Sequence, residues 1–289
     1  MLSSEIIKKI KQIEITTKRL LSGSFVGDYS SAKKGSGFEF DQIREYQLGD
    51  DVRFIDWKAS ARTNKVLVKQ YIEERNRAVI LAVDMSQSSF YSSSPELKVD
   101  VLKEIAAVLA LVADYGKDQA SLLLFTDEVE VFIPPARGIK HIHKIMESLF
   151  SYKPKNAGTN INCVLERLAK LRRKDSIVFL LSDFIGQVDE KKLHIVSRIY
   201  DLVAVRCIDK NEHGLPNVGF VDMQDIETGQ NVVIDARKKK AKVLTKFLEH
   251  RLNVQDGIFK KYGIDYLHVS PQKPFIGDII IFFRRRMMY

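Results

Sequence analysis

Residues 77–89 read RAVILAVDMSQSS, and this stretch decides the fold that we predict. Its first part, residues 78–83, is an unbroken apolar run of strand length. Such a run is typical of a strand buried on both faces, as in a parallel sheet. The run ends in Asp84, Ser86 and Ser88, so one carboxylate and two hydroxyls follow the strand at alternate positions. In an open α/β sheet, this edge is where ligands bind.

Two interpretations of the Asp84-x-Ser86-x-Ser88 motif stay open on local sequence alone. Hard oxygen ligands of this kind suit Mg²⁺ or Mn²⁺ rather than a metal that prefers thiolates. Asp and Ser are also ordinary turn residues, so the motif can instead cap the turn that follows the strand.

The rest of the chain alternates between short apolar runs and amphipathic stretches. We expect strands near residues 119–125, 129–133, 176–181, 202–208 and 265–269, and helices near 97–115, 139–149, 159–171, 191–200, 237–262 and 275–288. Pro134 and Pro135 should end the strand that precedes them. This alternation predicts a Rossmann-like α/β fold, with a mainly parallel sheet covered by helices on both faces.

We divide the chain into two regions. Residues 77–289 form the α/β domain, with a small hairpin insertion at 218–235 and a closing helix. Residues 1–76 hold an amphipathic helix that docks on another element and a small β segment rich in charges and aromatic rings.

Oxygen-bearing residues also follow two later junctions of the predicted sheet. Thr159 begins a helix after Gly158, and Asp183 ends the strand predicted at 176–181. Because neighbouring parallel strands present their carboxyl ends along one edge, these side chains can converge with the first motif. The predicted cation site is therefore Asp84, Ser86, Ser88, Thr159 and Asp183, with Ser89 and Asn160 as weaker candidates.

Residues 38–75 crowd opposite charges among aromatic side chains, including Trp57, the only tryptophan. We interpret them as two or three short strands carrying partly buried ion pairs that brace this segment against the sheet, although a partner-binding role remains open. The candidate network is Arg44, Asp50, Asp51, Arg53, Asp56, Trp57 and Arg62. Truncating a buried tryptophan costs about 3 kcal/mol or more, so we expect that loss for Trp57→Ala.

The three junctions together resemble the metal-ion-dependent adhesion site of von Willebrand factor A domains. Residues 44–63, REYQLGDDVRFIDWKASART, closely resemble the signature of a bacterial family called domain of unknown function fifty-eight. That resemblance implies a von Willebrand A-like core that binds a divalent cation and a protein partner. Its members are often encoded near MoxR-type AAA+ ATPases, which makes such an ATPase the implied partner. Many relatives carry membrane helices before the signature, and this chain does not.

Composition narrows the remaining classes of function. The chain has 289 residues and a net charge of +9, but its basic clusters are scattered and lack interleaved aromatic residues, so we do not expect nucleic-acid binding. Two isolated cysteines, no apolar run of membrane length and no signal peptide favour a cytoplasmic protein.

The main rival interpretation is a Mg²⁺-dependent phosphoester hydrolase. Such an enzyme of the haloacid dehalogenase type needs a second carboxylate two residues after its nucleophile, and that position is Ser86. We therefore predict a non-enzymatic interaction module.

Overall fold

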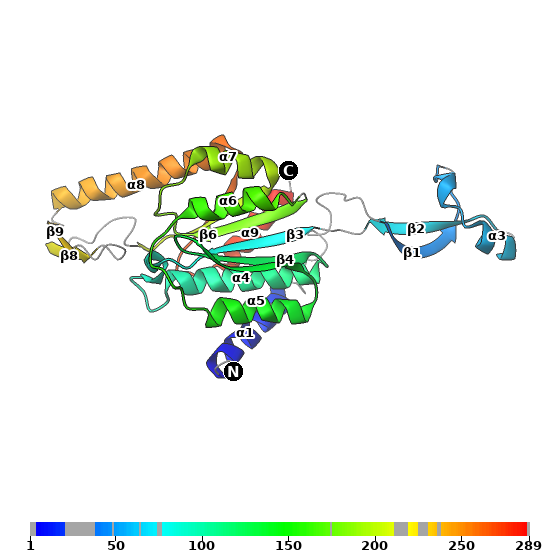
Figure 1. Cartoon of the computed structure of the whole chain (residues 1–289), viewed down its shortest axis with the longest axis horizontal. Coiled ribbons are helices and arrows are strands. Elements are labelled where there is room, and N and C mark those ends of the chain that lie inside the picture. Colours follow the sequence, from blue (N-terminus) through cyan, green and yellow to red (C-terminus); the bar gives the residue numbers. More distant parts are fainter. Residues whose placement is uncertain are drawn as a thin grey trace.

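The computed structural model describes residues 4–20, 38–47, 49–63, 65–73, 77–173, 175–210, 219–224, 231–235 and 238–287. Its centre is a six-stranded sheet in the order β10-β7-β6-β3-β4-β5 (Figure 1). The strands are β3 (Ala78–Asp84), β4 (Gln119–Phe125), β5 (Val129–Ala136), β6 (Ser176–Ser182), β7 (Asp201–Cys207) and β10 (Asp265–Val269). All neighbouring strands are parallel except β4 and β5. The predicted α/β fold class is confirmed.

The central position of β3 explains its apolar sequence. It pairs with β4 on one side and β6 on the other, and all seven of its residues are buried. One face of the sheet packs on α4 (Lys98–Tyr115), α5 (Ile139–Ser151) and α9 (Ile276–Met287), and α1 (Ser4–Leu20) packs on the outside of α4 and α5. The other packs on α6 (Ile161–Leu171), α7 (Glu190–Ile199) and the end of α8 (Lys238–Lys261). The two faces therefore bury separate apolar clusters, as a sheet covered on both sides requires.

One strand boundary differs from the sequence prediction. We expected Pro134 and Pro135 to end the third strand, but β5 continues through them to Ala136. β5 is the antiparallel edge strand, where the missing N–H of a proline costs no ladder hydrogen bond on the open side.

Residues 38–73 form a small unit that lies apart from the α/β body (Figure 1). It contains the antiparallel strands β1 (Phe38–Glu45) and β2 (Leu67–Glu73), the short 3-10 helix η2 (Val52–Phe54) and α3 (Trp57–Thr63). The helix α3 was not predicted. Its N-terminus is fixed by the Asp56 carboxylate, which accepts hydrogen bonds from the backbone N–H groups of Lys58 and Ala59.

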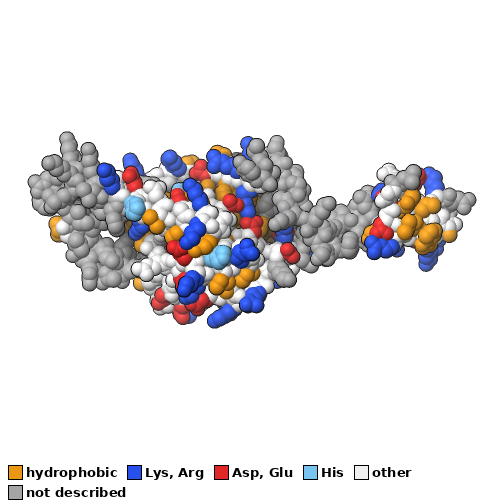
Figure 2. All heavy atoms as spheres, turned by 90° about the horizontal axis from the view of Figure 1, so that it is seen from above, with side chains coloured by type: hydrophobic (Ala, Val, Ile, Leu, Met, Phe, Trp, Pro, Cys, Tyr) orange, Lys and Arg blue, Asp and Glu red, His pale blue; other side chains and the backbone are white. Residues whose placement is uncertain are grey.

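The sequence interpretation of Trp57 as a buried residue was wrong. Its side chain is 69% exposed, and Ile43, Val52 and Val66 are exposed with it. Figure 2 shows hydrophobic side chains gathered on this outlying unit. The prediction that this segment is braced against the sheet was also wrong, because its charged residues form ion pairs within the unit itself. A high density of charged and aromatic residues in a sequence does not predict whether their side chains pack against the sheet or stay on their own unit.

We now expect Trp57→Ala to change the free energy of unfolding of the α/β body by less than about 0.5 kcal/mol, as is usual for an exposed side chain. Because Trp57 is the only tryptophan, unfolding in urea should be followed by far-UV circular dichroism. Leu81→Ala is the matched control at a fully buried position of β3 and should cost about 2–5 kcal/mol. A loss above about 1 kcal/mol for Trp57→Ala would restore the buried interpretation.

The remaining elements flank the body. The amphipathic helix α1 docks as predicted: Ile13 is buried, and Lys9 forms an ion pair with Glu104 of α4. α1 thus packs with the α/β body although we grouped it with residues 38–73, and the boundary at residue 76 stays a prediction. The predicted hairpin is present as β8 (Phe220–Gln224) and β9 (Asn231–Asp235), while its turn lies outside the described residues.

The distribution of charged side chains and the apolarity of the helices can be described for the part of the chain that the structure covers. On the face shown in Figure 2, Lys and Arg side chains are interspersed with Asp and Glu and form no continuous basic patch. Within the described residues, none of the helices combines the length and apolarity needed to cross a bilayer.

Candidate functional site

The loop after β3 holds its oxygen atoms close together because Asp84 organises the turn. The Ser86 N–H donates to Asp84 Oδ1 at 2.8 Å, which folds the backbone back over the end of the strand. The Oγ atoms of Ser86 and Ser88 are then 3.1 Å apart. All three residues are buried, so these oxygens line an interior rim of the sheet.

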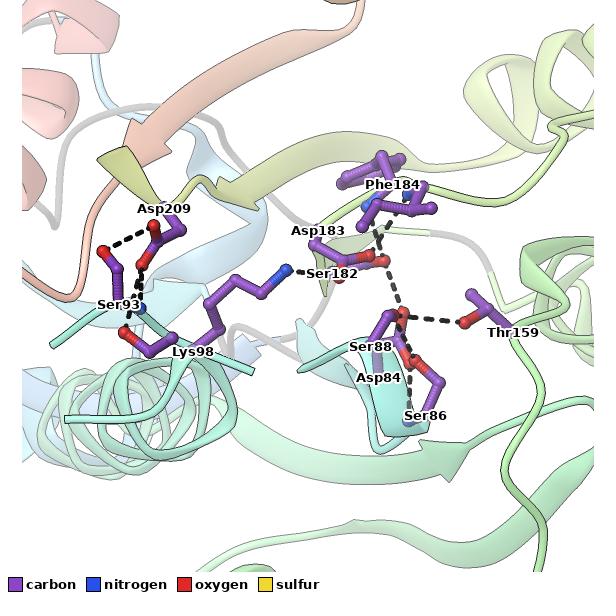
Figure 3. Close-up of polar contacts among 12 residues, drawn as sticks. Asp84, Ser86, Ser88, Ser93, Lys98, Thr159, Ser182, Asp183, Phe184 and Asp209 are labelled. Atoms are coloured by element: carbon purple, nitrogen blue, oxygen red, sulfur yellow. Dashed lines mark hydrogen bonds and ion pairs between the residues drawn. The ribbon is translucent and has the colours of Figure 1, made fainter. Parts of the chain in front are cut away.

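Thr159 reaches the same rim from the loop before α6. Its Oγ1 lies 3.5 Å from Ser88 Oγ (Figure 3). A β-carbon on Gly186, in the loop after β6, would lie 3.3 Å from the Thr159 carbonyl oxygen. The absence of a side chain at Gly186 therefore lets the loop after β6 approach the Thr159 loop closely.

The two weaker candidates have different surroundings. Asn160 caps α6, because its side chain accepts a hydrogen bond from the Asn162 N–H. Ser89 is fully buried, and its Oγ has no hydrogen-bond partner.

Asp183 completes the predicted set from the end of β6. It is 4% exposed as a residue, and its Oδ1 accepts the Ile185 N–H at 3.2 Å. Its other oxygen, Oδ2, accepts a hydrogen bond from Lys98 Nζ at 2.8 Å, and both side chains are fully buried (Figure 3). Sequence reasoning missed Lys98. The available signal was a lysine on the apolar stripe of α4, in line with Val101, Leu102 and Ile105.

Ser182 links Asp84 to the loop after β6, and sequence reasoning gave it no role. Its hydroxyl donates to Asp84 Oδ2 at 2.5 Å and accepts the Phe184 N–H at 2.9 Å. Phe184 is buried with φ at +54°, a left-handed conformation that is costly for a bulky residue. Backbone strain of this kind is often retained at functional sites. Here it turns the chain sharply after Asp183.

Burial and, after it, the like charge of Asp183 together raise the pKa of Asp84 to about 7. The hydrogen bonds from Ser182 and Ser86 act in the opposite direction but do not offset the burial. The neutral hydrogen-bond donors of Asp84 therefore do not offset the cost of burying its negative charge beside a second carboxylate.

A third strand-end carboxylate fixes the loop between the Ser88 turn and α4. Asp209 follows β7, is fully buried, and accepts hydrogen bonds from the Ser93 N–H at 2.8 Å and from Ser93 Oγ at 2.7 Å. Ser92 Oγ and Gln272 Nε2 also donate to it. Asp209 thus ties the start of α4, and with it Lys98, to the carboxyl edge of the sheet (Figure 3).

The candidate network of the signature block lies in the outlying unit, away from this rim (Figure 1). Arg44 makes a bidentate pair with Asp50 at 2.7 Å, which lowers the pKa of that carboxyl. Arg53 pairs with Asp51 and lowers the pKa of that carboxyl to about 2, but the Arg53 side chain is 82% exposed. Asp56 caps α3 and pairs with Lys69, and Arg62 is exposed at the other end of that helix. These contacts define the loops of the unit itself.

The residues at the rim fit a hard divalent cation. Their donors are two carboxylates and the hydroxyls of Ser86, Ser88 and Thr159, which is the ligand chemistry of Mg²⁺ and Mn²⁺. The raised pKa of Asp84 is a feature that an added cation would relieve, because a nearby positive charge favours the ionised carboxylate. No cluster of three or more His, Cys, Asp or Glu side chains suited to a metal occurs in the part of the chain that the structure describes. A cation at this rim would therefore depend on the hydroxyls.

A family profile described as "Protein of unknown function DUF58" matches residues 42–252. The chain belongs to the DUF58 family. The match begins in β1, just before the signature block, and ends in α8, so it includes most of the outlying unit and the whole candidate site.

Two relatives illustrate how far the DUF58 likeness extends in sequence. The uncharacterized protein Rv1480 of Mycobacterium tuberculosis is 28% identical over 223 residues, which cover 76% of this chain and 70% of that protein. The uncharacterized protein YeaD of Bacillus subtilis is 26% identical over 155 residues, which cover 53% of this chain and 35% of that protein.

Solved structures with a similar arrangement are more distant. They include BatB from Bacteroides thetaiotaomicron, with 13% identity, a TM-score of 0.47, and coverage of 74% of this chain and 99% of that one. The SpRpn10 VWA domain has 9% identity, a TM-score of 0.40, and coverage of 71% and 94%. Because these TM-scores are below 0.5, the fold of this DUF58 protein rests on its own sheet order.

Proposed function

We propose that this protein is a non-enzymatic interaction module that binds a divalent cation, Mg²⁺ or Mn²⁺, at the carboxyl edge of its sheet. One observation carries the proposal: the end of β3, the loop before α6 and the loop after β6 bring five oxygen-bearing side chains to one rim, and all but the half-buried Thr159 are buried. These residues are Asp84, Ser86, Ser88, Thr159 and Asp183. Asp84 and the three hydroxyls would hold the cation, with Asp183 beside them. An acidic side chain of a protein partner can complete the coordination of a bound cation.

The partner class follows from the family resemblance. DUF58 signatures are associated with MoxR-type AAA+ ATPases, and we propose such an ATPase, in the cytoplasm, as the protein that presents the acidic group. A pull-down of the ATPase by this chain should succeed with Mn²⁺ and fail with chelator. Capture that is equal under both conditions would argue for a surface other than this rim.

The direct test of the cation site is Mn²⁺ titration by calorimetry and by electron paramagnetic resonance. The wild-type chain should bind one Mn²⁺, and Asp84→Asn should lose at least about tenfold in affinity because the removed carboxylate charge faces the ion. Thr159→Val should weaken binding by a smaller factor, since it removes a neutral ligand.

The matched control is Asp175→Asn. Asp175 is exposed just before β6, at the amino edge of the sheet and therefore away from the rim, so its substitution should leave Mn²⁺ binding unchanged. Equal heats for the wild-type chain and Asp84→Asn would sink the proposal. Phosphoester turnover that depends on Asp84 would instead favour the hydrolase interpretation.

A further inference from the structure

The candidate site already contains one positively charged side chain, the ammonium group of Lys98. Lys98 lies in the first turn of α4, where the helix dipole disfavours positive charge, and its side chain is fully buried. Burying an ammonium group is costly unless it is paired. Its Nζ donates to Asp183 Oδ2 at 2.8 Å, and it points from α4 across the end of β6 toward the rim (Figure 3).

This ion pair makes the two carboxylates unequal. One oxygen of Asp183 takes the Lys98 ammonium and the other takes the Ile185 N–H. Asp84 receives hydrogen bonds only from neutral donors, the Ser86 N–H and the Ser182 hydroxyl. Two carboxylates and one ammonium leave the rim with a net charge of one negative unit when Asp84 is ionised.

We infer that Lys98 is a built-in counter-ion that sets the cation affinity of the site, by engaging Asp183 and leaving Asp84 as the only directly coordinating carboxylate. This inference rests on the proposed function. Because the ammonium repels a divalent cation at the same rim, the protein alone binds that cation weakly. A cation held by one carboxylate keeps an excess positive charge, so an acidic group from outside would strengthen its binding. Lys98 thereby couples cation occupancy to the arrival of an anionic partner.

The test is Mn²⁺ binding by Lys98→Met, which keeps the length and apolar stem of the side chain and removes its charge. We expect Lys98→Met to bind Mn²⁺ at least about tenfold more tightly than the wild-type chain. With chelator its melting temperature should be lower than that of the wild-type chain, because Asp183 loses its charged partner. Saturating Mn²⁺ should therefore raise its melting temperature by more than that of the wild-type chain.

Lys103→Met is the matched control. Lys103 is a second buried lysine of α4, but its Nζ lies over the Phe90 ring at 5.7 Å. Removing this charge should leave the Mn²⁺ affinity within about twofold of the wild-type value. An equal gain in both variants would show a general loss of positive charge rather than a role of Lys98 at the rim, and would overturn the inference.

A second variant keeps the inference testable if Lys98→Met does not fold. In Lys98→Met/Asp183→Asn both charges of the pair are removed and the shapes are kept, so the net charge of the rim is unchanged. We expect its Mn²⁺ affinity to stay within about threefold of the wild-type value. A loss of about thirtyfold or more would identify Asp183 as a direct ligand and overturn the inference.

Failure of the inference can be told apart from failure of the proposed function. If the wild-type chain binds Mn²⁺ and Lys98→Met binds no more tightly, the cation site stands and the role of Lys98 is rejected. If neither the wild-type chain nor Lys98→Met binds Mn²⁺ at millimolar concentration, both are rejected. Binding by Lys98→Met alone would support the role of Lys98, since it would show that the ammonium suppresses the site, and would reject cation binding by the wild-type chain on its own.

Discussion

Without divalent cation, the free energy of unfolding is expected to fall by about 4 kcal/mol as the pH rises from about 4 to about 7. The cause is Asp84, whose pKa rises from 3.8 in the unfolded chain to about 7 in the folded protein, mainly through burial. In this window the folded protein holds a proton that the unfolded chain has released. The stabilisation is therefore complete below pH 4 and is lost as the pH passes through the folded pKa. Urea denaturation in chelator at several pH values measures it.

The Asp84→Asn variant isolates this contribution from every other titrating group. Its amide has the same shape but no proton to lose, so the fall that belongs to Asp84 should be missing from its stability curve. Parallel curves for the variant and the wild-type chain would contradict the assignment. Under the proposed function, Mn²⁺ replaces the proton at Asp84, so the stability that Mn²⁺ adds should grow with pH over the same window.

The fold was predictable because its signals are local. An apolar run such as residues 78–83 has to be buried on both faces, and the alternation of such runs with amphipathic stretches leaves few other architectures. The convergence of Asp84 and Asp183 was predictable for a related reason, since the parallel strands β3 and β6 bring their carboxyl ends to one edge. Thr159 reaches that edge from the loop between α5 and α6, which follows no strand, so the strand argument does not explain its position. Both predictions used the period of the pattern and the topology, with no side-chain geometry.

Pairings between distant elements were not predictable in this way. Lys98 meets Asp183 across 85 positions of the chain, and Asp209 meets Ser93 across 116. No local pattern encodes which lysine will lie opposite which carboxylate. The prediction that Trp57 is buried failed for a different reason. Whether a large aromatic side chain is buried depends on what packs against it, and α3 displays this ring on a unit that stands apart from the sheet.

The other large effect is expected at Arg206, the largest fully buried side chain of the described residues. It projects from β7, and its guanidinium lies against the contacting rings of Phe184 and Phe259, at 5.8 Å and 5.4 Å from their centroids. Burial lowers its pKa, and the carboxylate of Asp256 in α8, 2.9 Å from Nη1, opposes that shift. Asp256→Asn removes this charge and should lower the free energy of unfolding by about 3–5 kcal/mol, because a buried guanidinium is left without a carboxylate.

The double variant Arg206→Met/Asp256→Leu separates the cost of an orphaned charge from the value of the pair. It replaces both ions by apolar groups against the same two rings, and breaking a buried pair costs far more than replacing it. We therefore expect its stability in urea to lie within about 2 kcal/mol of the wild-type value and above that of Asp256→Asn. If Asp256→Asn lies within about 0.5 kcal/mol of the wild-type chain, the pair does not hold α8 to the sheet. In that case the Phe184 and Phe259 rings alone would account for the position of Arg206.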